Sequence, residues 1–515
     1  MQISINFSPG LLTEITVTPA TDVKLVASYL RSNNKKYDVI SQRYFFRLTK
    51  VYDTYNRKTG VITVPLGLVK WLLIELLNHE IIRKEDIIVK DNRSDFDNFD
   101  LSKININDYK TLYNYSKSKE IALRDYQFEG IKALLLTNLG ILNFPTSSGK
   151  GEIIVALSKI LQQFGQVLVI VPTTASLIST EERLVDYGVK YFKYHKVRCL
   201  SSVDGVILST PKVINNDVLK IQPDSLLNTI KYILTNEVHH VQAVTWYNAI
   251  KGLPSVIRSY GFSATPDVTD SKSIVSIQNM LSRDAMIRGT HGDVVMEIKS
   301  KDIEKHISVP DILNVYYKPN IVDKDDVSNF DWNYIKKYLY EPNRIKFISD
   351  LVRIINDYTN FTTITFVSTI ETQGNPLFEL YPPNTACWYG GGEILNNVNY
   401  SSEELNKDSI FNAIKNRKIR HTIVTSHARE DVNLPALNVA IMLDLSKRQS
   451  IKQCVGRVVR KGTPSFFVNI FDVIPTVLKN QSKKRSKYIE EEYGITPIRI
   501  LNTNEFINYF KSVKK

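Results

Sequence analysis

A short run of small and polar residues around Lys150 has the composition of a loop that binds phosphate. Residues 143–151 read NFPTSSGKG; they follow an apolar stretch and precede residues that favour a helix. Backbone N–H groups at a helix N-terminus face a bound anion, and the helix dipole favours negative charge there. Lys150 would then place its ammonium group against the β- and γ-phosphates of a nucleotide. The residues that we expect around the phosphates are Thr146, Ser147, Ser148, Gly149, Lys150 and Gly151.

The loop departs at two positions from the usual phosphate-binding pattern, GxxxxGK followed by Ser or Thr. Phe144 replaces the first glycine, and Gly151 stands where a hydroxyl normally reaches Mg²⁺. The second change removes one of the groups that hold the metal ion.

A second group of polar residues follows the predicted strand Tyr232–Thr235. Glu237 would polarise the water that attacks the nucleotide, and His239 would link this site to the moving parts. Asn236 takes the position of an aspartate that usually holds Mg²⁺ through water. Asn236 and Glu237 are therefore the candidate metal-binding residues.

Two further segments of this region have side chains suited to a nucleotide site. Arg124 and Gln127 lie upstream of the loop, and the amide of Gln127 has the donor and acceptor needed to read an adenine edge. Downstream, Ser263 and Thr265 carry hydroxyls that would couple hydrolysis to domain closure.

The most specific pattern is QCVGRVVR at residues 453–460. Arg457 and Arg460 are spaced so that both lie on one face of a helix. Guanidinium groups delivered from a second domain stabilise charge on a transferring phosphoryl group. We therefore assign Arg457 and Arg460 a catalytic role and include Gln453 with them.

Short apolar strands that alternate with helices must position these residues. Continuous apolar runs are typical of parallel sheets covered on both faces, so the fold class is α/β with two such domains in tandem, at residues 113–310 and 311–515. The second domain ends in a basic extension. The strands predicted in the first domain are Gly140–Asn143, Val167–Val171, Gly205–Ser209, Tyr232–Thr235 and Gly261–Ser263. Those predicted in the second are Thr363–Val367, Ala386–Tyr389, Thr422–Thr425, Val439–Leu443 and Phe466–Phe471.

Residues 1–112 read as a small α+β domain. Strands are predicted at Gln2–Phe7 and Thr13–Val17, and a helix at Thr21–Leu30. One hairpin is predicted from Arg43–Tyr55 and Val61–Val64. Basic and aromatic residues interleave in this hairpin, which is either a face for nucleic acid or the solvated side of a half-buried hairpin.

The composition limits the classes of protein to which this chain can belong. The chain of 515 residues is too long to fold around one hydrophobic core. At about 150 residues per domain, this length suggests three domains. A net charge of +13 suits a polyanionic partner. Three widely spaced cysteines argue against a disulfide framework and a cysteine metal site, which indicates an intracellular setting. No signal peptide or membrane-spanning segment is expected.

This ordered set of motifs resembles superfamily 2 helicases of the DExH kind, some of which also lack the first loop glycine. The resemblance covers residues 120–475, and it extends over nearly the whole chain to the phage UvsW-type recombination helicases. It implies two RecA-like domains, ATP or another NTP with Mg²⁺, and a monomer in the host cytoplasm. The implied activity is that of an ATP-dependent DNA helicase on forks, Holliday junctions and R-loops in phage replication, recombination or repair.

The same resemblance assigns strand contacts to polar residues that follow predicted strands. Hydroxyl and backbone N–H groups position phosphates without reading sequence, although such a hydroxyl can instead cap a helix. A basic run near the C-terminus is either a duplex clamp or a solvated face. The candidates for nucleic-acid contact are Thr173, Thr174, Thr210, Ser368, Thr425, Lys483, Lys484 and Arg485.

Asn236 and Gly151 leave three explanations open. In the first, phosphates and waters hold Mg²⁺ with help from Thr146, Ser147 or Thr235, and the enzyme is active. In the second, Asn236 was introduced to trap a complex. In the third, the chain is a nucleotide-responsive DNA-binding protein without turnover. An RNA helicase and the translocase subunit of a restriction system are further alternatives, although no nuclease or methyltransferase domain accompanies the motifs.

Overall fold

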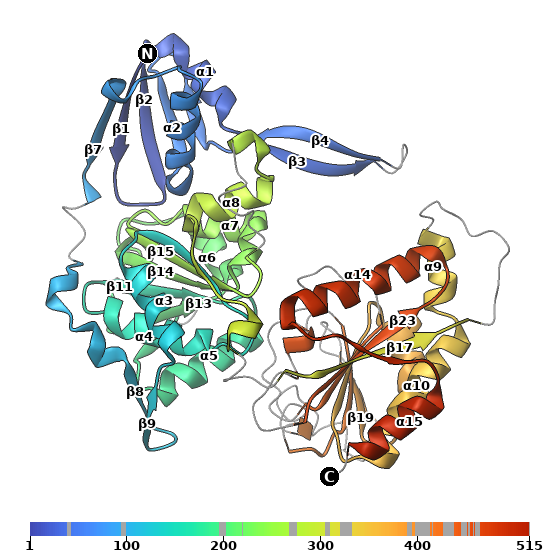
Figure 1. Ribbon diagram of the computed structural model, residues 1–515. Helices are drawn as coiled ribbons and strands as arrows, with labels where there is room; N and C mark the ends of the chain where they lie inside the picture. Colours follow the sequence, from blue (N-terminus) through green and yellow to red (C-terminus); the bar gives the residue numbers. More distant parts are fainter. Residues whose placement is uncertain are drawn as a thin grey trace. The chain divides into compact units, whose positions relative to one another are not determined.

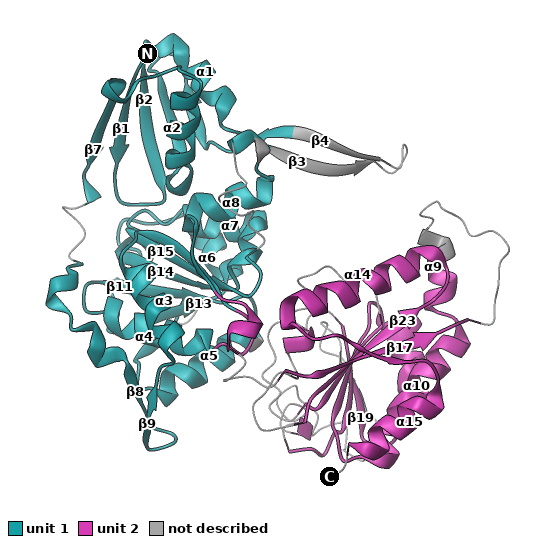
Figure 2. Ribbon diagram, in the orientation of Figure 1, with its two compact units in different colours: residues 1–144, 149–297 teal, residues 145–148, 298–515 magenta. Residues whose placement is uncertain are grey.

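The computed structural model describes residues 1–515 except 39–42, 94–98, 195–201, 219, 267–275, 304–308, 320–331, 389–393, 397–412, 415, 426–436, 444–450, 452–453, 457, 459–463 and 514–515. The chain divides into two compact units (Figure 2). One unit contains residues 1–144 and 149–297, and the other contains residues 145–148 and 298–515. The first unit contains a five-stranded and a seven-stranded sheet with their own hydrophobic cores, and the second contains an eight-stranded sheet with its core.

The first unit begins with an α+β layer, in which a five-stranded sheet has the order β5-β6-β2-β1-β7 (Figure 1). Every second residue of β2 is buried, as expected for a strand with one face on a core. The strands are β1 (Gln2–Phe7), β2 (Leu12–Thr18), β5 (Thr54–Asn56), β6 (Val61–Pro65) and β7 (Ile87–Asp91). The helices are α1 (Val23–Tyr29) and α2 (Val69–Asn78), which pack on this sheet through a shared core.

The predicted single hairpin of this layer is wrong. The segment Arg43–Tyr55 splits at residues 51–53, and only its end, β5, pairs with β6. Its first part forms β4 (Arg43–Lys50), which pairs antiparallel with β3 (Arg31–Asp38) in a separate two-stranded ribbon. The polar sequence of β3 hid its strand character, because it lacks the apolar alternation that marks a half-buried strand.

The first α/β sheet has seven parallel strands in the order β12-β13-β11-β14-β15-β10-β16. The strands are β10 (Leu139–Asn143), β11 (Gln166–Ile170), β12 (Tyr191–Lys193), β13 (Val206–Ser209), β14 (Ile230–Asn236), β15 (Arg258–Ser263) and β16 (Val294–Glu297). A separate hairpin pairs β8 (Thr111–Asn114) with β9 (Lys119–Ala122). All five strands predicted here are confirmed, and every residue of β13 and β15 is buried, as expected for a sheet covered on both faces.

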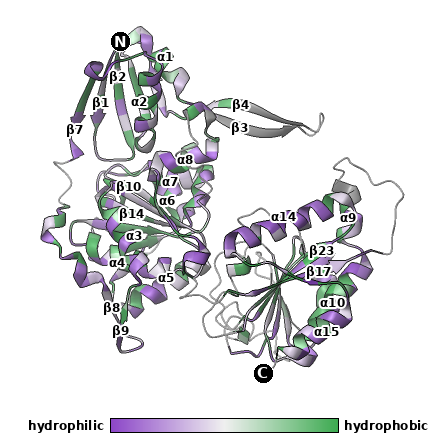
Figure 3. Cartoon of the chain, in the orientation of Figure 1, coloured by the Kyte–Doolittle hydropathy of each residue, from purple (hydrophilic) through white to green (hydrophobic). Residues whose placement is uncertain are grey.

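Helices cover this sheet in two layers. Three consecutive helices contact one another in one layer: α3 (Asp125–Leu135), α4 (Lys150–Leu161) and α5 (Thr174–Asp186). The other layer contains α6 (Pro211–Val218), α7 (Val244–Lys251) and α8 (Ser282–His291), which also contact in series. Figure 3 shows the hydrophobic residues concentrated in the strands between these layers.

Helix α8 joins the N-terminal layer to the first α/β sheet. Arg288 on this helix is fully buried; its Nε donates to Asp284 at 2.7 Å, and its Nη1 pairs with Asp293. The guanidinium carbon lies 5.6 Å from the centre of the Trp71 ring on α2. Glu75 of α2 accepts a hydrogen bond from the Ile277 backbone N–H at 2.9 Å. The Arg288–Trp71 contact and the Glu75–Ile277 hydrogen bond therefore join the two layers, and the ion pairs of Arg288 hold its guanidinium in place.

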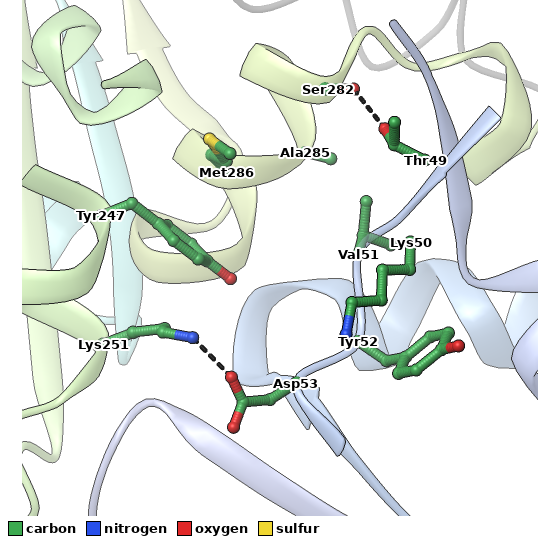
Figure 4. A pocket seen from close by; sticks show the side chains of 10 residues that line it. All are labelled: Thr49, Lys50, Val51, Tyr52, Asp53, Tyr247, Lys251, Ser282, Ala285 and Met286. Carbon is green, nitrogen blue, oxygen red and sulfur yellow. Dashed lines mark hydrogen bonds and ion pairs between the residues drawn. The ribbon is translucent and has the colours of Figure 1, made fainter. Parts of the chain in front are cut away.

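A cavity of about 230 Å³ lies beside this junction (Figure 4). Asp53 of the N-terminal layer pairs with Lys251 of α7 at 2.5 Å on one wall. On another wall, Thr49 lies 2.8 Å from the Ser282 hydroxyl, which begins α8. The two layers therefore also meet through polar contacts at the edge of their junction.

The second unit contains an eight-stranded sheet with the order β20-β19-β21-β18-β22-β23-β17-β24 among the described residues. Only the β19–β20 pair is antiparallel. The strands are β17 (Asp311–Tyr317), β18 (Thr363–Phe366), β19 (Thr385–Trp388), β20 (Ile394–Asn396), β21 (His421–Val424), β22 (Val439–Met442), β23 (Phe466–Asp472) and β24 (Ile498–Ile500). All five strands predicted in this region are confirmed.

The helices of the second unit also fall into two groups. Helix α10 (Pro342–Tyr358) contacts α11 (Asn375–Leu380) and α15 (Thr503–Ser512). The α9 (Trp332–Leu339) and α14 (Thr476–Tyr493) helices share a small apolar cluster. Among the described helices, none combines the length and the apolar composition needed to cross a membrane.

We expect Arg288→Ala to lower the free energy of unfolding of the first unit by about 3–5 kcal/mol, because it removes the ion pair of the buried Asp284 carboxylate. Thermal unfolding of the full chain measures this loss. Replacing both residues, as in Asp284→Leu with Arg288→Met, should cost much less.

The matched control is Lys70→Ala, which removes the exposed Lys70–Asp293 ion pair and should cost under about 1 kcal/mol. Equal losses for Arg288→Ala and Lys70→Ala would contradict a structural role for the buried network.

Candidate nucleotide site

The loop around Lys150 connects the end of β10 to the start of α4, which is the strand–loop–helix order expected for phosphate binding. The backbone of the loop is left-handed at Ser147, with φ 64°, and at Gly149, with φ 81°. Lys150 Nζ donates to the Phe144 carbonyl at 3.1 Å. The lysine ammonium therefore folds back over the loop that would surround the phosphates.

Gln127 is buried and ties α3 to this loop. Its Oε1 accepts from the Arg124 backbone N–H at 2.8 Å, and its Nε2 donates to the Gly149 carbonyl at 3.2 Å. A Cβ on Gly149 would lie 2.1 Å from that Nε2, so only glycine fits. The Arg124 guanidinium donates to the Tyr126 hydroxyl at 2.6 Å. Gln127 thus positions the loop, a role that the sequence did not reveal.

Glu237 follows directly after β14 and adopts a left-handed backbone, with φ 54° and ψ 57°. Such a conformation costs on the order of 1–3 kcal/mol for a residue with a side chain, and it occurs where function fixes an orientation. Its Oε2 accepts from the Ser263 hydroxyl at 3.3 Å and lies 3.4 Å from His239 Nδ1. His239 Nδ1 in turn lies 2.9 Å from the Ser263 hydroxyl. Three predicted residues from two strand ends therefore share one hydrogen-bonded cluster.

His239 also connects the cluster to helix α7. It is buried, and its ring lies 4.3 Å from that of His240. The His240 ring stacks on Trp246 of α7, with centroids 5.4 Å apart. A packed path thus runs from the Glu237 carboxylate through His239 and His240 to α7. Such a path is what the predicted linking role of His239 requires.

Thr235 lies below this edge and contacts a histidine that sequence reasoning missed. Its hydroxyl lies 2.8 Å from His291 Nε2, and Thr290 lies 2.8 Å from His291 Nδ1. Burial lowers the pKa of His291 to about 3, so the imidazole is neutral. Because Thr235 is fully buried and engaged by His291, it is not available to a metal ion.

The residues present do not provide the usual protein ligands for Mg²⁺. Position 151 has no hydroxyl, and Asn236 offers an amide where a carboxylate is usual. Glu237 is the carboxylate that follows β14, and its Oε2 is already bonded to Ser263. Among the described residues, no three His, Cys, Asp or Glu side chains gather into a metal-binding group. A divalent cation would depend on the nucleotide and water for its ligands.

The candidate strand-contact residues follow the carboxyl ends of neighbouring strands. Thr173 and Thr174 come after β11 and Thr210 after β13, which pair in parallel. Ser368 follows β18 and Thr425 follows β21, which also pair in parallel. Thr173 caps α5, since its hydroxyl accepts from the Ser176 N–H at 3.2 Å, whereas Thr174 and Ser368 are exposed. Their contact with nucleic acid stays a prediction.

The predicted contact of Arg485 with nucleic acid is wrong. Arg485 lies on the buried face of α14, where its Nε donates to Asn469 Oδ1 at 2.8 Å and its Nη2 to the Ile470 carbonyl at 2.6 Å. Lys483 and Lys484 lie exposed on the same helix. The signal that could have separated them is the helical spacing of the inward residues, which are Leu478, Ser482, Arg485 and Ile489.

Several predicted residues lie outside the described part of the chain. They are Gln453, Arg457, Arg460 and the segment after Thr425, residues 426–436.

Comparisons with known proteins identify a family and several proteins with similar sequences. A family model described as "Type III restriction enzyme, res subunit" matches residues 120–268. A protein of Sulfolobus islandicus filamentous virus assigned as helicase 22 is 23% identical over 499 residues, which cover 90% of this chain and 82% of that protein. The ATP-dependent DNA helicase uvsW of Enterobacteria phage T4 is 28% identical over 197 residues, which cover 37% of this chain and 36% of uvsW.

Among solved structures, S. cerevisiae Dbp5 bound to RNA and ADP BeF3 aligns with a TM-score of 0.51. The alignment has 15% identity and covers 76% of this chain and 98% of Dbp5, so it shows the fold alone. Together the matches confirm the predicted resemblance to superfamily 2 helicases and to UvsW, with two tandem RecA-like domains. They also confirm the prediction of an NTP-hydrolysing helicase.

We expect Glu237→Gln to lower the rate of NTP hydrolysis by about 10²-fold or more, because an amide cannot polarise the attacking water. Nucleotide affinity should change little, since the side chain keeps its shape. Phosphate release under saturating nucleotide measures the rate. The control is Glu129→Gln on the exposed face of α3, and an unchanged rate in Glu237→Gln would overturn the assignment.

The neutral His291 predicts a pH dependence of stability. Its pKa lies below the unfolded value of 6.5, so its contribution is complete above pH 6.5 and is lost as the pH falls toward 3. The loss approaches about 1.4 kcal/mol per pH unit. In melting curves from pH 7.5 to 4.5, His291→Gln should show a shallower fall in Tm than the parent chain. Parallel curves would refute the buried neutral state.

Proposed function

We propose that this superfamily 2 helicase is an ATP-dependent motor that acts on branched DNA, such as forks, Holliday junctions and R-loops, in phage replication, recombination or repair. The observation that carries the proposal is the convergence of three features at the carboxyl edge of the first α/β sheet. These are the loop at Lys150, the Glu237–His239–Ser263 cluster, and the polar residues after β11 and β13. Hydrolysis and strand contact would then share one edge of one sheet.

The coupling between them follows from the contacts of His239. A change of charge at Glu237 alters its hydrogen bond with Ser263 and its contact with His239. Thr265, two residues beyond Ser263, donates its backbone N–H to the Ser263 hydroxyl at 3.1 Å. The segment after β15 would therefore respond to the state of the nucleotide.

The second domain is proposed to complete the hydrolytic site. Arg457 and Arg460 would stabilise charge on the transferring phosphoryl group, and Gln453 would assist them. Thr425, Ser368, Lys483 and Lys484 would contact the DNA backbone from this domain. We propose that the chain acts as a monomer and, given its viral relatives, in the cytoplasm of an infected host.

The N-terminal layer supports the preference for branched DNA. Its junction with α8 combines a shared apolar core, the stacking of buried Arg288 on Trp71 and the Glu75–Ile277 hydrogen bond, so it cannot move freely from the motor domain. The ribbon of β3 and β4 carries basic and aromatic residues in its sequence, at Lys35, Lys36, Arg43 and Tyr44 among others. A rigidly attached basic element would bind a duplex arm while the motor pulls one strand.

A nucleotide-responsive DNA-binding protein without turnover is the second candidate. Asn236 and Gly151 favour it, because both remove usual support for Mg²⁺. The intact cluster of Glu237, His239 and Ser263 favours the active motor, since a binding protein has no use for a positioned water-activating carboxylate.

Steady-state ATP hydrolysis with and without DNA tests the proposal. We expect forked DNA to stimulate hydrolysis at least tenfold more than RNA of matched length, and Lys150→Ala to abolish the stimulated rate. The fork should also be unwound in a gel assay. DNA binding without stimulated hydrolysis would establish the second candidate, and stronger stimulation by RNA would establish an RNA helicase.

A further inference from the structure

The side chain of Arg183 occupies the space beside Gly151 where the phosphate-loop hydroxyl normally lies. A Cβ on Gly151 would stand 1.4 Å from Arg183 Nη1, 2.5 Å from its Cζ and 2.9 Å from its Cδ. Gly151 is the second residue of α4, and Arg183 lies in the last turn of α5. The guanidinium therefore lies where a Ser or Thr side chain would begin, and a side chain at 151 would require the guanidinium to move.

Glu152 helps to hold this guanidinium in place. Its Oε1 lies 3.6 Å from Arg183 Nε, and both side chains are half-buried. Its Oε2 points toward the phosphate loop, since it would lie 3.0 Å from a Cβ on Gly149. A carboxylate in this position repels phosphate unless a cation neutralises it, and Arg183 is the paired cation. The Nη1 group still faces Gly151.

Asn236 and Arg183 make this edge more positive, and Gly151 removes a neutral metal ligand from it. Asn236 removes a negative charge that would attract a metal ion, and Gly151 removes a hydroxyl ligand of that ion. Arg183 adds a positive charge where the hydroxyl is missing. A guanidinium forms strong charge-assisted hydrogen bonds with phosphate oxygens, whereas it repels a cation held at the same point.

We propose that Arg183 binds the phosphate chain of the nucleotide directly and takes over part of the charge neutralisation that a protein-held metal ion provides in related sites. This inference rests on the proposed nucleotide site. It assigns a binding role to a residue of α5, while Lys150 keeps its place on the β- and γ-phosphates. Nucleotide affinity should then depend only weakly on Mg²⁺.

Binding of ADP to the full chain, with Mg²⁺ or with EDTA, tests the proposal by calorimetry. The parent chain should lose less than about tenfold in affinity when Mg²⁺ is removed. Arg183→Gln should weaken ADP binding in EDTA by about ten- to a hundredfold, the effect of losing a charged hydrogen bond. Lys190→Gln, which breaks an exposed ion pair in the same domain, is the matched control and should bind as the parent does.

The decisive variant combines Arg183→Gln with Glu152→Gln, because it separates direct contact from neutralisation of Glu152. If Arg183 binds phosphate, the double variant stays weak in EDTA. If Arg183 only neutralises Glu152, the double variant recovers the parent affinity and the proposal is refuted. Melting temperatures show whether each variant is folded.

Failure of the nucleotide site itself would look different. In that case the parent chain would not bind ADP with or without Mg²⁺. A parent chain that binds ADP only with Mg²⁺ would keep the nucleotide site and overturn the role of Arg183.

Discussion

The register of the parallel strands at the centre of the first sheet is the constraint on which the site depends. Asn143 at the end of β10 lies opposite Ser263 at the end of β15, and Asn236 at the end of β14 lies opposite Phe262. Parallel hydrogen bonding therefore brings three strand ends to one level. The loop that starts after Asn143, the Glu237 carboxylate and the Ser263 hydroxyl are neighbours for this reason, although they are far apart in sequence. A shift by one residue in any strand would separate them and would move every side chain of that strand to the opposite face of the sheet, against different helices.

The strands and the order of the motifs could be predicted because both leave local signals. The runs at Val167–Val171 and Val439–Leu443 are apolar throughout, which is typical of a strand covered on both faces. The segment around Lys150 places small residues between such a strand and a helix, as a phosphate loop demands. The roles of Glu237 and Ser263 followed from their positions at strand ends, and their shared hydrogen bond agrees with that reasoning.

The errors and omissions concern contacts between distant segments, which carry no local signal. Arg183 meets Gly151 because α5 packs on α4, and nothing near either residue indicates the other. His291 contacts Thr235 through the packing of α8 on the sheet. The lysines that precede Arg485 predict a surface residue, yet the helical period turns it onto β23. The ribbon of β3 and β4 was missed because its first strand is polar throughout.

Helix α8 makes the N-terminal layer an integral part of the first unit and not an appended module. In the last turn of the helix, Arg288 contacts Trp71 and Asp293, and His291 contacts Thr235 directly before Asn236. The layer and the catalytic edge thus share a single rigid support. Separating the N-terminal layer from the catalytic edge would expose the buried charges of α8 to solvent. It would also remove the packing behind β14. Natural or laboratory exchange of this layer between related motors would therefore have to bring its own version of α8 along.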